Sequence, residues 1–427
     1  MASVNSPDPA LVRAAGAGRP EERLSDMTGL IPIGETNAHA DPQIVYDRLR
    51  AQWGTVAPVE LEPGINAWLV MGHAELISVL RRERSFAKNA AHWRDLAEGR
   101  VRPESPLLVL MSPRPNAWMA DAEEHRRLRA PIDAAVHGLL MRDTRRHAQE
   151  ACTDVIADFA DRGRADLVSD YALMIPTMAV GRLLGLGLSA ARQLQQAQLD
   201  LFSGGEKAQA GLDRFMGILA AQVAARTAQP ADDMTTVIVQ HPNLTANAER
   251  VHTMAVMIAA ASENIMAWIA GTLQLMLTDE RFSGRMHGGL LGIDDALDEV
   301  LWFEPPVSNL PARYALHDIE LGGRMIRKGD PLILGFGPAQ ADLRAGTDEW
   351  SRIDNRSHVS WGAGPHMCPA HAPGRLIVRT AVESVLHQLP GVRLTVPAHE
   401  IGRLESPWTR CPAALPVTFT AARRASW

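Results

Sequence analysis

The order of hydrophobic and polar positions predicts a chain with many helices in its middle and short strands toward both ends. Residues 67–72 form a short apolar segment typical of a strand. From about 121 to 300 apolar residues recur at helical spacing, and residues 254–277 are almost wholly apolar, as expected of a helix through the centre of a large domain. After residue 305 short strands and turns follow, with a hairpin predicted in residues 320–330 and a last strand at 414–421.

This order of elements predicts a mainly helical fold with small β-sheets to one side, an α+β-like layout. Residues 1–25 are rich in Ala, Gly, Pro and charged residues, so we expect a flexible tail there. Because no linker, repeat or low-complexity segment divides residues 26–427, we expect them to form one domain.

Charge and hydropathy exclude several classes of protein. The formal net charge of −6 is too mild to indicate binding to nucleic acid or to a membrane surface. Ser262, Glu263 and Asn264 interrupt the apolar segment at 254–277, so no membrane span is expected. The first residues lack the basic-then-apolar layout of a secretory signal, which indicates a cytoplasmic protein.

Cysteine is rare in the chain, with only Cys152, Cys368 and Cys411. Such an odd and scattered set argues against a disulfide framework and against a structural zinc site.

The most informative segment surrounds Cys368. Gly362 and Gly364 permit tight backbone turns close to a flat ligand. Cys368 stands just before a predicted helix, with Pro369 where a first-turn proline is favoured. The N–H groups and the positive end of that helix favour a thiolate, which an iron ligand requires. Taken alone, a buried cysteine is more often a small hydrophobic residue, so a purely structural role is the alternative.

The combined order of residues resembles the haem-binding signature of the cytochrome P-450 superfamily, which runs aromatic-Gly-x-Gly-x-His/Arg-x-Cys-x-Gly. Trp361, Gly362, Gly364, His366 and Cys368 match in register, while Trp361 replaces the usual Phe and Ala370 the usual Gly. The resemblance implies a helix-rich triangular prism that holds haem b between the family's I and L helices. It also implies that Cys368 is the iron ligand of an oxidoreductase.

The resemblance extends along nearly the whole chain. Residues 121–129 are similar to the family's C-helix signature, and residues 313–330 resemble a segment that begins with a propionate-binding Arg. Arg is well suited to bidentate contact with a carboxylate. The contacts to the haem propionates that the resemblance implies are His125, Arg129, Arg313, His358 and His366.

One departure concerns the family's K helix, which usually carries Glu-x-x-Arg. Here Glu299 is followed by Trp302 at the position of the Arg. We expect Glu299 to bond Arg356 directly while the indole of Trp302 fills the vacated volume. The same loss is typical of a small actinobacterial subgroup, which the C-terminal segment also resembles.

A second departure lies in the predicted I helix. Relatives show Ala-Gly-x-acid-Thr above the iron, whereas this chain has Ala260, Ala261, Ser262, Glu263 and Asn264. An Asn amide can hold a water or an oxygen, yet it cannot pass on a proton as a hydroxyl can. Either hydroxylation or an oxidative C–C or C–N coupling is therefore compatible with the site, for example on a tryptophan-containing cyclic dipeptide. Alternatively, these polar residues satisfy the backbone at a helix distortion.

The resemblance places a lid over the substrate at about residues 86–118 and 198–216. Candidate contacts to a small-molecule substrate are Trp93, Ala260, Ser308 and Asn309. The chain carries no flavin or ferredoxin signature, so a ferredoxin and its reductase are the expected electron donors. Either a basic docking face or an ordinary solvated surface is expected at Arg126, Arg127, Arg375 and Arg379.

Two other classes of function stay open on the sequence. One is a non-catalytic haem protein that senses a ligand or scaffolds a complex, which the departures at Trp302 and Asn264 favour. The other is a haem-free helical protein that uses its Cys-Pro loop for regulation.

Overall fold

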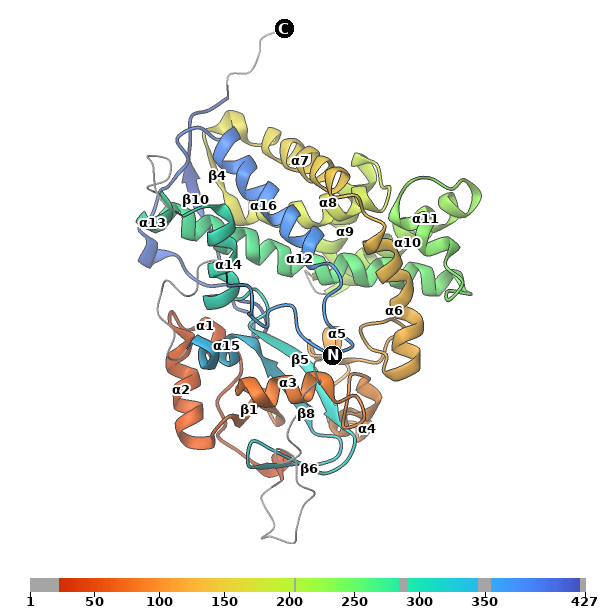
Figure 1. Cartoon of the computed structure of the whole chain (residues 1–427), viewed down its shortest axis with the longest axis vertical. Helices are drawn as coiled ribbons and strands as arrows, with labels where there is room; N and C mark the ends of the chain where they lie inside the picture. The colour runs from red at the N-terminus through yellow and green to blue at the C-terminus, as the bar shows by residue number, and fades with distance from the viewer. Residues whose placement is uncertain (1–22, 203–204, 284–290, 345–354, 423–427) are drawn as a thin grey trace, which may run out of the picture.

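A single long helix, α12 (Asn247–Thr278), runs through the middle of the helical part of the molecule (Figure 1). A computed structural model describes residues 23–202, 205–283, 291–344 and 355–422. Because α12 is apolar around most of its circumference, its side chains are buried against helices on several sides. Its main helical neighbours are α8 (Ile175–Leu183), α10 (Gly205–Ala228), α14 (Ile293–Phe303) and α16 (His371–Gln388).

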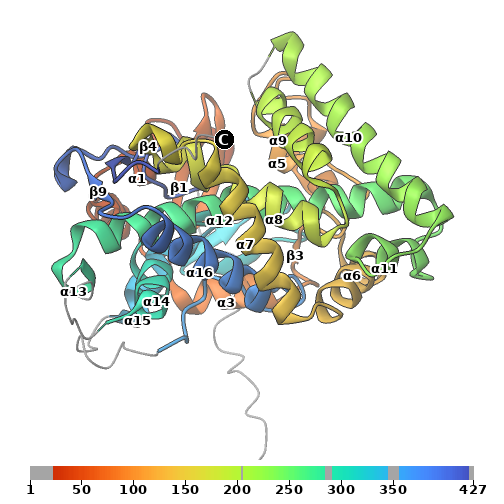
Figure 2. The same cartoon turned by 90° about the horizontal axis from the view of Figure 1, so that it is seen from above.

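Helices cover α12 from two opposite directions, as Figure 2 shows. On one side lie α16 and α7 (Met141–Ala157), which pack against each other. On the other side lie α9 (Leu188–Phe202) and α10, also packed together. Two further helices, α6 (Ala122–His137) and α11 (Met234–Gln240), contact each other at the edge of this layer.

A five-stranded sheet forms the lower part of the molecule in Figure 1. Its strands, in spatial order, are β1 (Val56–Glu62), β2 (Ile65–Val70), β8 (Pro331–Gly335), β5 (Asn309–Ala315) and β3 (Phe86–Ala87). Only β2 and β8 run parallel. Alternate residues of β2 enter two different apolar clusters, because both faces of the sheet are covered. The predicted strand at 67–72 is confirmed.

The smaller strands also agree with the sequence. β6 (Ile319–Leu321) and β7 (Arg324–Ile326) form the predicted hairpin, and Gly322 and Gly323 have φ angles of 56° and 74°. These left-handed angles match the turn that joins twisted antiparallel strands. A separate three-stranded sheet contains the predicted last strand, and its members are β4 (Arg164–Asp166), β10 (Pro416–Thr418) and β9 (Arg393–Leu394).

Shorter helices connect these layers. Three of them, α2 (Pro42–Trp53), α3 (His73–Arg81) and α15 (Phe336–Arg344), pack around the sheet. The remaining one- or two-turn pieces are η2 (Leu24–Asp26), α1 (Glu35–Ala38), η3 (Ala90–His92), α4 (Arg94–Ala97), α5 (Leu108–Met111), η4 (Ala160–Arg162), η5 (Leu167–Ala172), α13 (Glu280–Ser283) and η8 (Ala398–Glu400).

The structure describes only part of the expected tail and of the expected lid. Residues 1–22 of the tail and residues 203–204 of the second lid segment lie outside the described residues. Leu24, however, is 4% exposed and belongs to an apolar cluster, and its carbonyl accepts a hydrogen bond from Asn66. Leu24 therefore packs against the rest of the chain, within the range expected to be a tail.

The length and composition of α12 would also suit a membrane span. In this structure its apolar surface packs against helices of the same chain. A core helix therefore accounts for its hydrophobicity, as the sequence predicted.

Candidate active site

Cys368 lies in a tightly turned loop that leads into α16. Gly362 and Gly364 have φ angles of 73° and 69°, in the left-handed region that favours glycine. A Cβ at Gly364 would lie 2.4 Å from the carbonyl oxygen of Leu80, so no other residue fits there. The Cys368 N–H donates to the carbonyl of Trp361 at 2.9 Å, which closes the loop.

The surroundings of the Cys368 sulfur differ from the sequence expectation. α16 begins at His371, with Ala370 as its N-cap, so Pro369 lies before the helix and not in its first turn. Burial raises the pKa of the Cys368 thiol, against the opposing effects of the Ala370 N–H and the positive charge of Arg129. Helix-end groups alone therefore do not make this cysteine a thiolate. A bound metal ion would, because it deprotonates a coordinating thiol.

A buried group of basic side chains lies near the cysteine loop. Lys88 is 2% exposed and Arg313 3% exposed, and within the described part of the chain neither forms an ion pair. The Lys88 ammonium donates to the Pro311 carbonyl at 2.7 Å. His125 and His366 stack with their ring centroids 3.9 Å apart. Burial lowers the pKa of His125 to about 4, and it also lowers the pKa of Lys88 and of His366.

Several polar atoms of this group have no hydrogen-bond partner among the residues that the structure describes. They are Nδ1 of His125, Nε2 of His366 and Nε1 of Trp118, all buried. The Lys88 ammonium lies 4.3 Å from the centroid of the Trp118 ring, so Trp118 belongs to the same group. Buried donors without partners are costly unless a ligand satisfies them. Cations and N–H donors together fit the carboxylates of a ligand.

Lys88 and Trp118 are the site residues that sequence reasoning missed. The chain contains only three lysines, Lys88, Lys207 and Lys328, and Lys88 lies between Ala87 and Asn89 in a mixed polar and apolar segment. The rarity of lysine could have drawn attention to Lys88, but nothing in the sequence indicates that its side chain is buried.

Two other predicted propionate contacts, Arg129 and His358, lie outside this group. Arg129 donates to the carbonyl of Met367 at 2.8 Å and pairs with Asp133 at 2.7 Å, so it braces the cysteine loop from α6. His358 lies edge-on to Trp302 with a centroid separation of 5.8 Å, and its buried Nδ1 has no hydrogen-bond partner among the described residues. Burial lowers the pKa of His358 to about 4, and the charge of Asp298 on α14 opposes this effect most strongly. His358 therefore lies beside α14, and His125, Arg313 and His366 form the shared group.

The polar residues of α12 bond back to their own helix. The Ser262 hydroxyl donates to the carbonyl of Ile258 and the Asn264 amide donates to the carbonyl of Ala260, both at 2.8 Å. Such bonds to the residue four positions earlier satisfy the side chains locally. Ala260 and Glu263, three residues apart, are both exposed on one face of the helix.

Glu263 also acts on the C-terminal segment. Burial, and then the negative charge of Glu263, raises the pKa of Cys411 to about 12. This thiol is 1% exposed, so Cys411 is a core residue and not a second reactive cysteine.

The K-helix departure takes a different form from the one expected. Trp302 is 5% exposed on α14 and fills a buried position, as predicted, and its indole N–H donates to the carbonyl of Asn355 at 2.7 Å. Arg356, however, pairs with Asp298 at 3.3 Å, one position before Glu299 on the helix. Glu299 pairs instead with Arg281. The expected Glu299–Arg356 bond was wrong because Glu299 lies on the side of the helix that faces α13.

Three of the predicted substrate contacts do not fit the structure. Trp93 is fully buried in the apolar cluster shared by the sheet and α2. The Ser308 hydroxyl lies 3.2 Å from that of Tyr46, and the Asn309 amide donates to the Thr36 hydroxyl at 2.9 Å. These side chains are bonded within the core, so a substrate could reach them only if the core opened.

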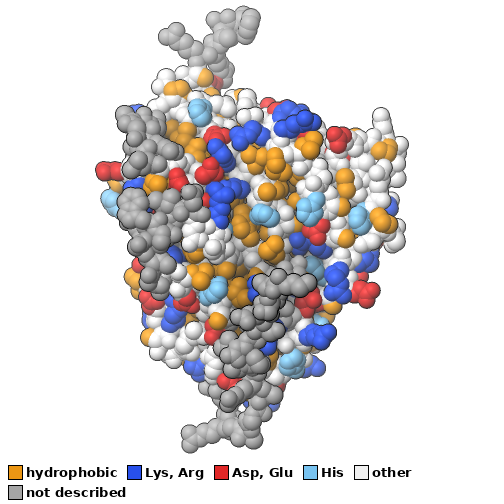
Figure 3. All heavy atoms as spheres, viewed as in Figure 1, with side chains coloured by type: hydrophobic (Ala, Val, Ile, Leu, Met, Phe, Trp, Pro, Cys, Tyr) orange, Lys and Arg blue, Asp and Glu red, His pale blue; other side chains and the backbone are white. Residues whose placement is uncertain are grey.

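The predicted basic face is largely neutralised. Arg375 and Arg379 of α16 pair with Asp294, and Arg127 pairs with Glu249. Arg126 lies 4.0 Å from the Glu83 carboxylate and has the most exposed side chain of the four arginines, at 65%. Figure 3 shows that Lys and Arg side chains on this face are interspersed with acidic and hydrophobic ones and form no continuous positive field.

The arrangement defines a class of protein. Within the described residues no three His, Cys, Asp or Glu side chains come together as a metal site, so a metal held by the chain alone is not indicated. One cysteine in a glycine-turned loop, beside buried unpaired donors for carboxylates, fits a haem whose porphyrin supplies the other iron ligands. Fold and site thus define a haem-thiolate protein.

Comparison with curated proteins gives the same class. No family profile matches the chain. It is 25% identical to the 2-hydroxy-5-methyl-1-naphthoate 7-hydroxylase of Streptomyces carzinostaticus, over 87% of this chain and 93% of that enzyme. It is 27% identical to the nocardicin C N-oxygenase of Nocardia uniformis, over 88% and 94%. It is 25% identical to the cytochrome P-450 monooxygenase PikC of Streptomyces venezuelae, over 90% and 93%.

Solved structures agree over the same length. CYP154A1 from Streptomyces coelicolor superposes with a TM-score of 0.76 at 26% identity, over 92% of this chain and 99% of that one. The myxobacterial cytochrome P-450 CYP267B1, in complex with myristic acid, gives a TM-score of 0.77 at 26% identity, over 91% and 98%. The chain therefore has the cytochrome P-450 fold and resembles bacterial cytochrome P-450 monooxygenases over nearly its whole length.

Proposed function

We propose that this protein oxidises a small hydrophobic secondary metabolite, with O₂ as the oxidant and electrons from a ferredoxin and its reductase in the cytoplasm. The single observation that carries the proposal is Cys368 in its glycine-turned loop beside the buried, unpaired donors at His125, His366 and Trp118. Relatives named for hydroxylation and N-oxygenation of natural products support the substrate class.

In this proposal the protein's own residues hold and orient the haem. Cys368 would bind the haem iron through its sulfur, and the haem would supply oxidation of the substrate by O₂. Lys88 and Arg313 would pair with the propionates, which would neutralise their buried positive charges, and the neutral imidazoles of His125 and His366 would donate hydrogen bonds to them. Arg129 holds the loop by its bond to the Met367 carbonyl.

Proton delivery depends on α12. Glu263 is exposed and carries the only acidic group among the polar residues at the middle of the helix. Ser262 and Asn264 bond to backbone carbonyls, so each would have to exchange this bond for one to a water in order to relay a proton. Slow proton delivery favours reactions that end in removal of an electron or hydrogen atom, such as C–C or C–N coupling, over hydroxylation. Trp302 further suggests the subgroup that lacks the K-helix arginine.

The first test is the absorption spectrum of the reduced, CO-bound protein expressed with haem, compared with Cys368→Ala. We expect the red-shifted Soret band of a thiolate-ligated haem, which the Cys368→Ala variant should lose. A band at the shorter wavelength of a neutral ligand would contradict thiolate ligation, and the absence of any haem band would overturn the proposal.

A second experiment separates an oxidase from a non-catalytic haem sensor. The protein is supplied with a surrogate ferredoxin, its reductase and NADPH, and indole-containing cyclic dipeptides are screened for products by mass spectrometry. A mass gain of one oxygen indicates hydroxylation, and loss of two hydrogens indicates coupling. The sensor is favoured if a compound shifts the haem spectrum and the protein takes up electrons, but no product forms from that compound.

A further inference from the structure

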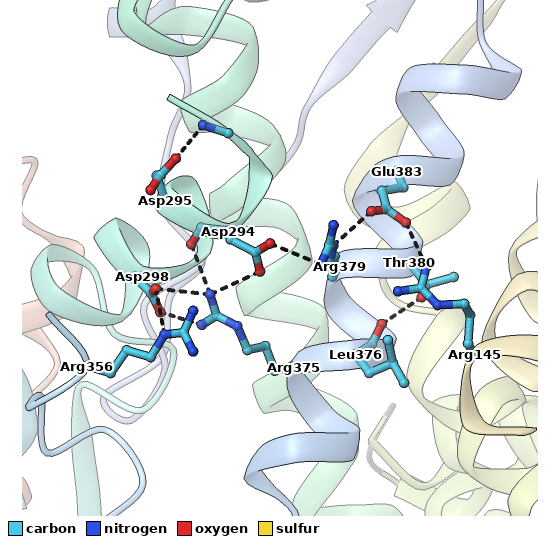
Figure 4. Close-up of polar contacts among 11 residues, drawn as sticks. Arg145, Asp294, Asp295, Asp298, Arg356, Arg375, Leu376, Arg379, Thr380 and Glu383 are labelled. Carbon is cyan, nitrogen blue, oxygen red and sulfur yellow. Dashed lines mark hydrogen bonds and ion pairs between the residues drawn. The ribbon is translucent and has the colours of Figure 1, made fainter. Parts of the chain in front are cut away.

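A network of ion pairs ties α16 to α14 (Figure 4). Its centre is Asp298 on α14, whose side chain is 7% exposed. Arg375 of α16 contacts both carboxylate oxygens of Asp298, one of them at 3.0 Å. Arg356 reaches the same carboxylate at 3.3 Å. A buried carboxylate that receives three N–H contacts is fully engaged, so this pair is a fixed feature of the site.

Arg375 binds a second position on the same helix. Its Nη2 atom lies 3.1 Å from the carbonyl oxygen of Asp294 and 3.2 Å from a carboxylate oxygen of that residue. Asp294 and Asp298 are one helical turn apart, so one guanidinium spans a full turn of α14. Only the planar fork of an Arg can make such contacts, because a Lys offers a single point charge.

The position of Arg375 connects this network to Cys368. α16 begins at His371, three residues after the cysteine, with Ala370 as its N-cap. Arg375 lies in the second turn of the helix. Fixing Arg375 against α14 therefore fixes the start of α16, and with it the end of the short loop that carries Cys368.

Trp302 explains why α14 needs such a partner. At the position where relatives carry an Arg, the indole offers one N–H, which the Asn355 carbonyl accepts. The helix thus has no cation of its own at this position, and Asp298 obtains both of its cations from other segments.

We propose that Arg375 is the positioning residue for Cys368 and takes over the role of the missing K-helix arginine, through its two-oxygen contact with Asp298. The inference rests on the proposed haem-thiolate function. It concerns how the sulfur is held and not whether haem binds.

The test compares Arg375→Gln and Asp298→Asn with the wild type, at matched haem content. The readout is the fraction of the reduced CO complex that shows the thiolate band instead of the shorter-wavelength band. We expect each variant to lose at least half of the thiolate fraction, and the double variant to lose no more than the worse single one, because both changes break one contact.

Two residues at the far end of the same network provide matched controls. Arg145 of α7 and Glu383 of α16 pair with each other at 3.2 Å, away from α14. Arg145→Gln and Glu383→Gln remove the same kinds of charge, and we expect both to retain the wild-type thiolate fraction. An equal loss in these controls would mean that α16 is merely destabilised, and it would overturn the proposal.

A rescue experiment tests directly whether Arg375 takes over the role of the missing K-helix arginine. Adding Trp302→Arg to Arg375→Gln returns a cation to α14, and we expect part of the lost thiolate fraction to recover. If Arg375→Gln does not incorporate haem, Arg375→Lys replaces it, with an intermediate fraction expected. A wild-type fraction in either Arg375 variant contradicts the proposal. If the wild type itself lacks the thiolate band, the proposed function fails before this inference is tested.

Discussion

At the scale of single residues, the site is dominated by buried basic side chains that bond to backbone carbonyls but form no ion pair within the described residues. Lys88 and Arg313 are almost completely buried, and burial lowers the pKa of Arg313 to about 10. An isolated buried charge is expensive, and it persists in a protein when a ligand compensates it. The haem propionates of the proposed site provide that compensation.

Lys88 gives the most direct prediction at this scale. Replacing it by Met removes a charged hydrogen bond to a propionate, worth about 1.5–3 kcal/mol. We expect haem to dissociate from Lys88→Met roughly tenfold to a hundredfold faster than from the wild type, which corresponds to that free energy. Haem transfer to an excess of an acceptor protein measures the rate.

Two comparisons make the Lys88 result specific. Lys88→Arg keeps the charge and should retain haem nearly as well as the wild type. Lys328, whose backbone lies in an exposed turn, serves as a control, and Lys328→Met should not change the rate. Equal rates in Lys88→Met and the wild type would place Lys88 outside the haem site.

The histidines predict how stability depends on pH in the protein without haem. Burial lowers the pKa of His125 and of His358 to about 4, below their ordinary value near 6.5. Between these values the unfolded chain binds more protons than the folded one, so stability falls as pH decreases from about 6.5 to about 4. We expect a loss on the order of 2 kcal/mol for each histidine, after allowance for solvent screening.

Urea unfolding of the haem-free protein over this pH range measures the effect. A His125→Gln variant should show a flatter pH dependence, because the neutral amide binds no proton. An unchanged slope would mean that His125 is protonated in the folded state.

At the scale of elements, Gly362 and Gly364 of the cysteine loop differ in how much space they leave for a side chain. Both need a left-handed φ, which costs a residue with a side chain about 1–2 kcal/mol. Gly362 has space for a Cβ, whose nearest neighbour would be the Met367 Cα at 4.0 Å. Gly364 has none, because the Leu80 backbone lies against it.

The two glycines therefore predict unequal outcomes on substitution. Gly362→Ala should lower the free energy of unfolding by about 1–2 kcal/mol and retain haem. Gly364→Ala should lower it by about 4 kcal/mol or more and lose most of the haem, because the backbone has to move. Haem-to-protein ratio and thermal unfolding measure both, and equal effects would contradict the close approach of the Leu80 carbonyl.

At the scale of the whole molecule, α6 and α16 carry the face nearest the cysteine loop. Most of its arginines are paired with carboxylates, so the surface is not strongly positive. Arg126 lies one turn before Arg129, which bonds the Met367 carbonyl next to Cys368. An acidic electron donor that approaches the cysteine loop would therefore meet Arg126.

Charge reversal tests this docking route. Arg126→Glu should slow reduction by an acidic ferredoxin a few-fold at low ionic strength, and the difference should vanish in high salt, because exposed charges mainly change the association rate. Arg48→Glu is the control, since Arg48 on α2 is similarly exposed, at 60%. A similar effect of both variants would indicate a general charge effect and no specific docking.

The sequence determined much of this protein by itself. Three features could be predicted from short stretches of consecutive residues: the long apolar helix α12, the hairpin at Gly322 and Gly323, and the loop around Cys368. They depend on local backbone preferences and on the spacing of hydrophobic residues, which neighbouring residues determine. The signature at Cys368 therefore led to the haem-thiolate family that the comparisons support.

Only the tertiary structure decided which side chains meet across segments. The burial of Lys88 and the pairing of Asp298 with Arg375 and Arg356 join residues far apart in the chain, and no local pattern encodes them. The sequence predicted Trp93 as a substrate contact, but packing of the sheet against α2 places its side chain in the core. Local rules fix where the backbone turns, whereas burial and charge pairing depend on which surfaces the fold brings together.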